Sequence, residues 1–183
     1  MRNAGPTALA VQDQRGFTLL EILIVAAVIS ALCAIAVPGL IRARRASLES
    51  AAVASLRSIT SAQATYASSC ARGGYAQSLD DLSKPAAGGA QLFISPDIPA
   101  NGAVKSGYIF NVGPDTAAMV VLSGAQTCNG AGLDAVSGYF AEAHPGEAAA
   151  GQRAFASDTR GIIFYTSSGA AISPGMAGAE PLH

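Results

Sequence analysis

A run of 20 residues without a charged side chain, from Ile22 to Ile41, constrains this chain more than any other feature. As an α-helix rising about 1.5 Å per residue, the run would be roughly 30 Å long, which matches the hydrocarbon core of a bilayer. Glu21 lies directly before the run, and a carboxylate at that depth is costly unless it has a partner. The sequence therefore predicts a membrane helix over residues 17–41 with one ionic group near its start.

The residues at the start of this helix form a specific motif. Gly16 is followed by Phe17, Thr18 and Leu19, then by Glu21 and the apolar helix. This pattern resembles the class III signal of type IV pilins and of the pseudopilins of type II secretion, and the resemblance covers residues 15–66. It implies that a prepilin peptidase removes residues 1–16 as a leader and methylates the new amine of Phe17.

The same resemblance implies that the protein is located first in the inner membrane and later in a filament. The protein would wait as a single-pass protein in the inner membrane, in contact with lipid. An inner-membrane assembly platform and an ATPase-driven machine would then draw it into a helical filament of identical subunits in the periplasm or at the cell surface. Glu21 would pair there with the Phe17 ammonium of its own or a neighbouring subunit. A buried acid is tolerated only when it is paired, so such a pair would set the register of the filament.

Three simpler interpretations remain open for the apolar run. It could be an ordinary membrane anchor with an incidental Glu21, or a secretory signal cleaved after the A-x-A site at residues 34–36. Against the secretory signal, the acid lies inside what should be an uncharged core, which is also longer than usual. A lipoprotein signal at Cys33 fits less well, because Leu32 stands where a small residue is expected.

Pro38 and Gly39 interrupt the apolar run, since proline removes a helix donor and clashes with the preceding turn. Helical spacing resumes at once, so we predict a kink or locally melted turn within a longer helix; the alternative is a helix end. Over residues 42–69, apolar positions three or four apart predict an amphipathic half-helix laid against a soluble domain. Its apolar face consists of Leu48, Ala52, Leu56, Ile59, Gln63 and Tyr66, and its polar face of Arg42, Arg45, Glu49, Ser50 and Arg57.

A basic cluster, Arg42, Arg44 and Arg45, follows the apolar run directly. Basic residues beside a membrane helix tend to remain in the cytoplasm, and the leader offers only Arg2 and Arg15 in competition. That tendency alone would place the C-terminal domain inside the cell. The prepilin-like motif implies the opposite topology, and we follow the motif because it is more specific.

Residues 70–183 predict a globular head, so the whole chain is expected to be an α+β protein. Residues 70–105 carry loop chemistry, with a helical turn at residues 77–82 and Ser78 as its cap. Alternating patterns then predict an antiparallel sheet of about four strands packed on the amphipathic half-helix. The strand patterns cover residues 108–112, 117–122, 137–143, 153–157 and 162–166, and the tail from residue 168 is expected to be loose.

The chain has three cysteines and a formal net charge of −1. Cys33 lies in the apolar run and is most simply a small apolar residue. If the head is exported, Cys70 and Cys128 are a natural disulfide pair; the alternative is two free thiols. The charge balance gives no reason to expect a nucleic acid partner.

No motif of catalysis is present, neither a nucleophile elbow nor a phosphate-binding loop, so we expect no enzyme, no cofactor and no metal. The Asp80-Asp81 pair is most simply a solvated turn, and His144 a loop histidine. A calcium site in the head would need several clustered oxygen ligands, and the candidates are dispersed in sequence: Asp134, Glu142, Glu147 and Asp158.

Three functions compete on these grounds. The leading one is a structural subunit of a type IV pilus. The second is a pseudopilin, which would form a short periplasmic piston for protein export. The third is a minor pilin that binds DNA or an adhesion target. The third would need an exposed basic or aromatic patch, and aromatic residues make up only 6% of the chain.

Overall fold

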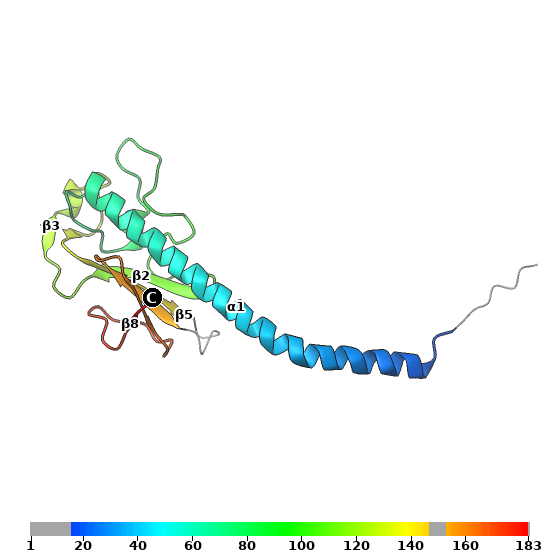
Figure 1. The fold of residues 1–183 in the computed structure, drawn as a ribbon. Coiled ribbons are helices and arrows are strands. Elements are labelled where there is room, and N and C mark those ends of the chain that lie inside the picture. The colour runs from blue at the N-terminus through cyan, green and yellow to red at the C-terminus, as the bar shows by residue number, and fades with distance from the viewer. Residues whose placement is uncertain (1–15, 147–152, 183) are drawn as a thin grey trace, which may run out of the picture. The chain divides into compact units, whose positions relative to one another are not determined.

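The computed structural model describes residues 16–146 and 153–182, and Figure 1 shows the order of their elements along the chain. The chain divides into two compact units between Arg42 and Ala43, which we describe separately. The elements are α1 (Leu19–Ser69), α2 (Leu79–Leu82), β1 (Ala103–Lys105), β2 (Tyr108–Pro114), β3 (Val120–Leu122), a 3-10 turn η1 (Gly124–Gln126), β4 (Ala135–Val136), β5 (Tyr139–Pro145), β6 (Ala154–Asp158), β7 (Ile163–Thr166) and β8 (Glu180–Pro181).

Helix α1 is 51 residues long and continues through Pro38 and Gly39. The alternative in which the helix ends at this pair is therefore wrong. The flanking residues are mainly alanine, leucine and isoleucine, and a long run of such residues maintains a helix across one missing backbone donor. A kink at Pro38 and Gly39 stays a prediction.

In the second unit, one face of α1 forms the core of the head. The predicted stripe is confirmed, because Ala52, Leu56, Ile59, Gln63 and Tyr66 are all buried, and Leu48 packs against the core as a partly buried residue. The same cluster contains side chains from β2, β5 and β6, among them Tyr108, Phe110, Ala141 and Phe155. The predicted α+β arrangement, a long helix packed against an antiparallel sheet, is confirmed.

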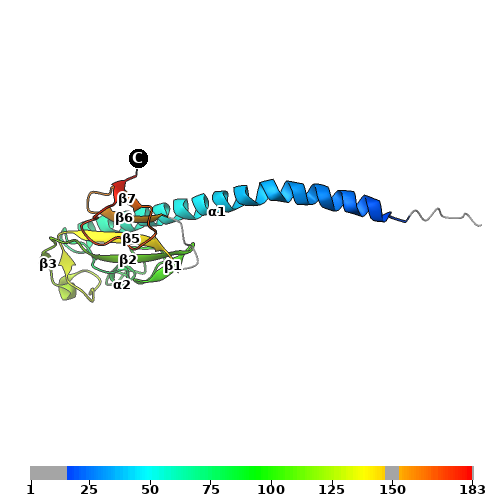
Figure 2. The ribbon, with the colours of Figure 1, turned by 90° about the horizontal axis from the view of Figure 1, so that it is seen from below.

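The main sheet has six antiparallel strands in the order β1-β2-β5-β6-β7-β8, rather than about four. Figure 2 shows β1, β2, β5, β6 and β7 of this sheet side by side. The pairing of β2 with β5 is the longest and runs from Tyr108 opposite Pro145 to Pro114 opposite Tyr139. Strands β6 and β7 form the hairpin predicted around residues 158–161. Prediction missed β1 and β8 in this sheet, which are only three and two residues long and so too short for an alternating pattern.

The strand predicted at residues 117–122 is present only as β3, which is shorter and does not belong to the main sheet. It pairs with β4 in a separate two-stranded sheet. The reason lies in β2, whose two edges are already occupied by β1 and β5. A strand that follows β2 in sequence therefore has no free edge of β2 to join.

Two further expectations are corrected. The tail is not loose, because Ile172 is buried against Phe140, Ala154 and Ala156 on the outer side of the sheet, and β8 pairs with β7. His144 is not a loop residue but part of β5. The predicted helical turn with its Ser78 cap is confirmed as α2, since Ser78 Oγ accepts a hydrogen bond from the Asp81 backbone N–H at 3.2 Å.

Candidate processing and assembly site

The start of α1 is fixed by a threonine cap. The Glu21 backbone N–H donates to Thr18 Oγ1 at 3.2 Å, and the Thr18 carbonyl accepts from the backbone N–H groups of Glu21 and Ile22 at 3.1 and 3.3 Å. Threonine is a preferred residue at this position because its hydroxyl satisfies a backbone donor that the helix leaves unpaired. Gly16 and Phe17 therefore precede the helix, and the peptide bond between them lies in non-helical backbone.

Both residues that flank this bond are accessible. The Phe17 side chain is 78% exposed, and a β-carbon placed on Gly16 would meet no atom within 4 Å. A protease needs an accessible, non-helical peptide at the bond that it cuts, and α1 begins only at Leu19, two residues after Phe17. The geometry leaves the predicted cleavage point free of any local obstruction among the described residues.

Glu21 lies in the first turn of α1 and is exposed. The positive end of the helix dipole favours a carboxylate there, at about 0.3–1 kcal/mol at an exposed position. Within the described parts of the chain, Glu21 has no ion-pair partner. The pairing of Glu21 with the Phe17 amine stays a prediction.

The apolar half of α1 presents large apolar side chains to the outside at nearly every turn. Of the helices in the described ranges, α1 alone is long and apolar enough to cross a membrane. A helix that is apolar all round needs an apolar environment on every side. The exposed side chains include Leu19, Leu20, Ile22, Leu23, Ile24, Val25, Val28, Ile29, Leu32, Ile35, Val37, Leu40 and Ile41.

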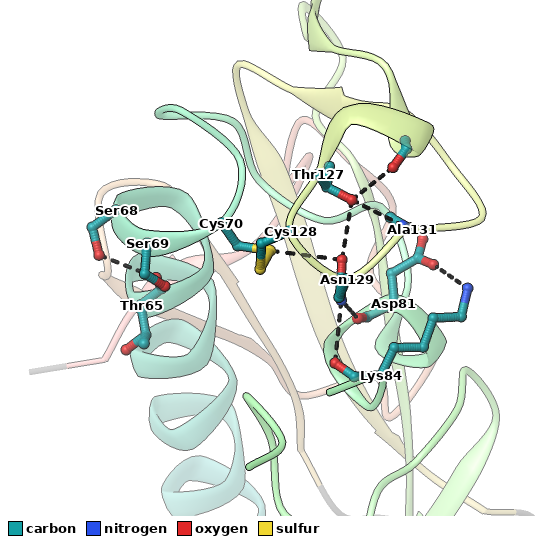
Figure 3. Close-up of a disulfide and its surroundings, with 11 residues drawn as sticks. Thr65, Ser68, Ser69, Cys70, Asp81, Lys84, Thr127, Cys128, Asn129 and Ala131 are labelled. Carbon is teal, nitrogen blue, oxygen red and sulfur yellow. Dashed lines mark hydrogen bonds and ion pairs between the residues drawn. A yellow bond between two sulfur atoms is a disulfide. The ribbon is translucent and has the colours of Figure 1, made fainter. Parts of the chain in front are cut away.

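At the other end of α1, the structure joins Cys70 and Cys128 in a disulfide, with the two Cα atoms 4.7 Å apart (Figure 3). The bond connects the residue after α1 to the loop that follows η1, and it is the pairing that the sequence favoured. Because the two cysteines lie 58 positions apart in sequence, the disulfide closes the long connection between the helix and the small β3-β4 sheet.

A buried carboxylate, Asp81, supports this loop and corrects the expectation of a solvated turn. Asp81 is only 2% exposed. It accepts hydrogen bonds from the backbone N–H groups of Gly132 at 2.6 Å and Leu133 at 3.3 Å, and from Lys84 Nζ at 2.9 Å. Burial alone would raise the pKa of this carboxyl, but these hydrogen bonds outweigh burial and lower its pKa. Asn129 adds hydrogen bonds to the carbonyls of Asp81 and Lys84, as Figure 3 shows.

Sequence reasoning also missed an ion pair between α1 and the sheet. Glu49, expected on the solvent face, accepts from Arg153 Nη2 at 2.6 Å and from Arg153 Nε at 3.0 Å. The guanidinium also lies over the rings of Phe155 and Tyr165. Tyr108 donates its hydroxyl to the Arg153 carbonyl at 2.9 Å. Burial and the Glu49 charge raise the pKa of Tyr108 to about 12, against the opposing effect of Arg153. Glu49 and Arg153 lie 104 positions apart, so no local sequence pattern predicts that they pair.

The acidic residues proposed as calcium ligands have other partners in the head. Asp134 accepts from the Gly124 backbone N–H, Glu142 from Asn111 Nδ2, and Asp158 from Arg160, while Glu147 lies outside the described residues. Within residues 16–146 and 153–182, no group of three or more histidine, cysteine, aspartate or glutamate side chains could hold a metal ion.

Fold and site together define a class of protein: an apolar, capped N-terminal helix followed in the chain by an α+β head that packs on the helix's second half. Comparison with protein families matches the prokaryotic N-terminal methylation motif over residues 12–37. The chain thus carries the class III prepilin signal, the N-terminal methylation motif of type IV pilins and pseudopilins, which are typically non-enzymatic structural subunits. Its apolar helix and signal are consistent with anchoring in the inner membrane before assembly. No curated protein and no solved structure matches the chain.

Proposed function

We propose that this protein is a structural subunit of a type IV pilus. A prepilin peptidase cleaves between Gly16 and Phe17 and methylates the Phe17 amine. The mature chain remains in the inner membrane as a single-pass protein, and an ATPase-driven machine at the assembly platform then inserts it into a filament of identical subunits. The protein performs no catalysis in this role.

One observation carries the proposal: a capped helix whose large apolar residues are exposed all round, preceded by an accessible Gly16–Phe17 bond and carrying Glu21 in its first turn. Lipid can cover such a surface, and so can identical helices in a filament core. Only the second environment offers Glu21 the free amine of Phe17 from a neighbouring copy. A pair of this kind allows one register between adjacent helices and penalises the others, because a buried charge without a partner costs about 3–5 kcal/mol.

A pseudopilin of a secretion system would share every one of these N-terminal features. The disulfide between Cys70 and Cys128 fits both roles, since disulfides form and persist in the periplasm as well as at the cell surface. Filaments seen on the surface of native cells would support the pilus. A short fibre confined to the periplasm would support the secretion role.

The experiment that tests the proposal is intact-mass measurement with N-terminal sequencing of the protein from native cells. A chain that begins at Phe17 with one added methyl group supports the proposal. A chain that begins at Val37 would make the protein an ordinary secreted one and overturn the filament role. A chain that begins at Met1 would leave a plain membrane anchor, also without a filament role.

Substitution of Glu21 by alanine tests the assembly step. We expect Glu21→Ala to stay in the membrane fraction. Its amount in filaments should fall by more than about tenfold, because the Phe17 ammonium then has no partner. Sheared filaments and membranes are compared by immunoblot. Asp97→Ala, which removes an exposed acid of the head, is the control and should assemble normally. Normal filament yield from Glu21→Ala would refute the role of Glu21 in register.

A further inference from the structure

We propose that Arg42, Arg44 and Arg45 bind the phosphate headgroups of anionic phospholipids in the outer leaflet of the inner membrane. This inference rests on the topology in the proposed function, which places the head outside the cytoplasm. It assigns a role to a basic cluster that the prepilin signal does not involve.

Position in the chain places the three arginines at headgroup depth. The uncharged run ends at Ile41, and a helix of that length crosses about one hydrocarbon core. Arg42 is the next residue, so the first guanidinium lies where the hydrocarbon gives way to phosphate. The side chains of arginines near a helix end extend toward that boundary while their methylene groups remain among the acyl chains.

Each of the three arginines is exposed, and none forms an ion pair within the described residues. Other cations of the head have acidic partners: Lys84 has Asp81, Arg153 has Glu49 and Arg160 has Asp158. The acid four residues beyond Arg45 on the same helix is Glu49, and both of its oxygens bind Arg153. The basic cluster therefore lacks a counter-charge from the described part of its own chain.

The spacing of the cluster favours lipid over a protein partner. At 3.6 residues per turn, Arg44 is rotated by about 200° from Arg42, and Arg45 by about 300°. Arg42 and Arg45 thus lie about 60° apart on one side of α1, and Arg44 lies on another side. A protein that docks on one face would reach one or two of them, whereas lipid headgroups surround a membrane helix and reach all three. A guanidinium can also bind a phosphate through two parallel hydrogen bonds.

This binding would offset part of the free-energy cost of the topology in the proposed function. Arginines outside the cytoplasm oppose the usual distribution of charge beside a membrane helix. Anionic headgroups lower the free energy of that arrangement, because basic residues at an anionic surface are attracted within about one Debye length. The cluster would then hold the mature helix at a defined depth until the assembly machine withdraws it.

The test uses the full-length mature chain labelled at Cys33 with a donor dye, since the other two cysteines form the disulfide. The chain is placed in phosphatidylcholine vesicles containing a small amount of acyl-chain-labelled phosphatidylglycerol or acyl-chain-labelled phosphatidylcholine as acceptor. We expect energy transfer to show severalfold enrichment of phosphatidylglycerol around the helix, up to about fivefold per arginine at low salt. The enrichment should fall in high salt.

Variants make the assignment specific. The triple substitution of Arg42, Arg44 and Arg45 by glutamine should abolish the enrichment, and substitution of all three by lysine should retain most of it. Arg57→Gln is the matched control, because Arg57 is exposed on the same helix but lies 12 positions beyond the cluster's last arginine, Arg45. Equal transfer to both lipids, or enrichment that survives the triple glutamine substitution, would overturn the proposal. A third outcome would also overturn the proposal: the unmodified chain shows no enrichment of phosphatidylglycerol, yet the triple glutamine variant no longer assembles into filaments. The arginines would then contact a neighbouring subunit.

Failure here is distinguishable from failure of the proposed function. The vesicle assay needs neither a filament nor the assembly machine. The filament role is decided by the mature N-terminus and by Glu21→Ala, which leaves the basic cluster intact.

Discussion

The two halves of α1 differ in where they find their apolar contacts. From residue 48 to residue 66, the apolar positions form one stripe, and Leu56 in that stripe is completely buried by the sheet. From residue 19 to residue 41, the apolar positions occupy all sides, and Leu23 remains 58% exposed. Composition and periodicity both separate the two halves, since the run from Ile22 to Ile41 has no charged residue and the striped half carries Glu49 and Arg57. The apolar contacts of the striped half come from its own chain, whereas the other half needs an apolar environment that the described part of the chain does not supply.

The largest effect on the head should come from the disulfide at the end of the striped half. Replacing Cys70 and Cys128 by serine should lower the free energy of unfolding of the head by about 4 kcal/mol, because the unfolded chain loses the constraint of a long closed loop. Urea unfolding of the mature chain in mild detergent measures this through the near-ultraviolet signal of buried Tyr66, Tyr108 and Tyr139. Cys33→Ser is the control and should change the value by less than about 0.5 kcal/mol. A decrease in the free energy of unfolding below about 1 kcal/mol would show that other contacts, and not the disulfide, stabilise the segment between α1 and the β3-β4 sheet.

Matched leucine substitutions test the comparison directly. Leu56→Ala should lower the free energy of unfolding of the head by about 3 kcal/mol, since it opens a cavity among completely buried side chains. Leu23→Ala changes the same residue type on the same helix and should leave the head within about 0.5 kcal/mol of the unmodified chain. The same urea titration serves both variants. Equal losses would mean that the two halves unfold as one unit, and the contrast between them would fail.

A smaller effect, of about 2 kcal/mol, is expected from Asp81→Asn, since charge-assisted hydrogen bonds to two backbone groups and Lys84 are weakened. The pKa of Asp81 is lowered in the folded head, so its contribution is fully present above the unfolded pKa of about 4 and is lost as pH falls through the folded value. Urea unfolding at a series of pH values should therefore show the head losing stability below about pH 4, and Asp81→Asn should reduce that loss. An unchanged pH profile in the variant would contradict this role for Asp81.

Much of this arrangement could be predicted because its signals are local. The buried face of α1 follows from apolar residues three or four positions apart, and the Ser78 cap from a single residue before a helical turn. The strands β2, β5, β6 and β7 follow from alternation over four or more residues. Each of these depends on neighbours in sequence, so the sequence carries the information without the fold.

The features that sequence reasoning missed depend on residues that only the fold brings together. Glu49 meets Arg153 across 104 positions, and Asp81 accepts hydrogen bonds from Gly132 and Leu133 about 50 positions away. Strand β3 was assigned to the wrong sheet because alternation predicts a strand but not its partner. The processing residues were identified by a motif, yet their accessibility became visible only when the cap at Thr18 placed them before the helix.

The smallest effect is expected where α1 first meets the head, at Glu49. Glu49→Gln should lower the free energy of unfolding by about 1 kcal/mol, because the Arg153 side chain is 41% exposed and water compensates the lost charge. The loss should shrink at high salt, unlike that of Leu56→Ala, since only the ion pair is screened. A second measurement isolates the charge: the pKa of Tyr108, raised to about 12 by burial and by Glu49, should fall in the variant when tyrosinate absorbance is followed. Arg57→Gln is the control and should change neither. A loss as large as that of Leu56→Ala would mean that the ion pair, and not the apolar stripe, holds this half of the helix to the sheet.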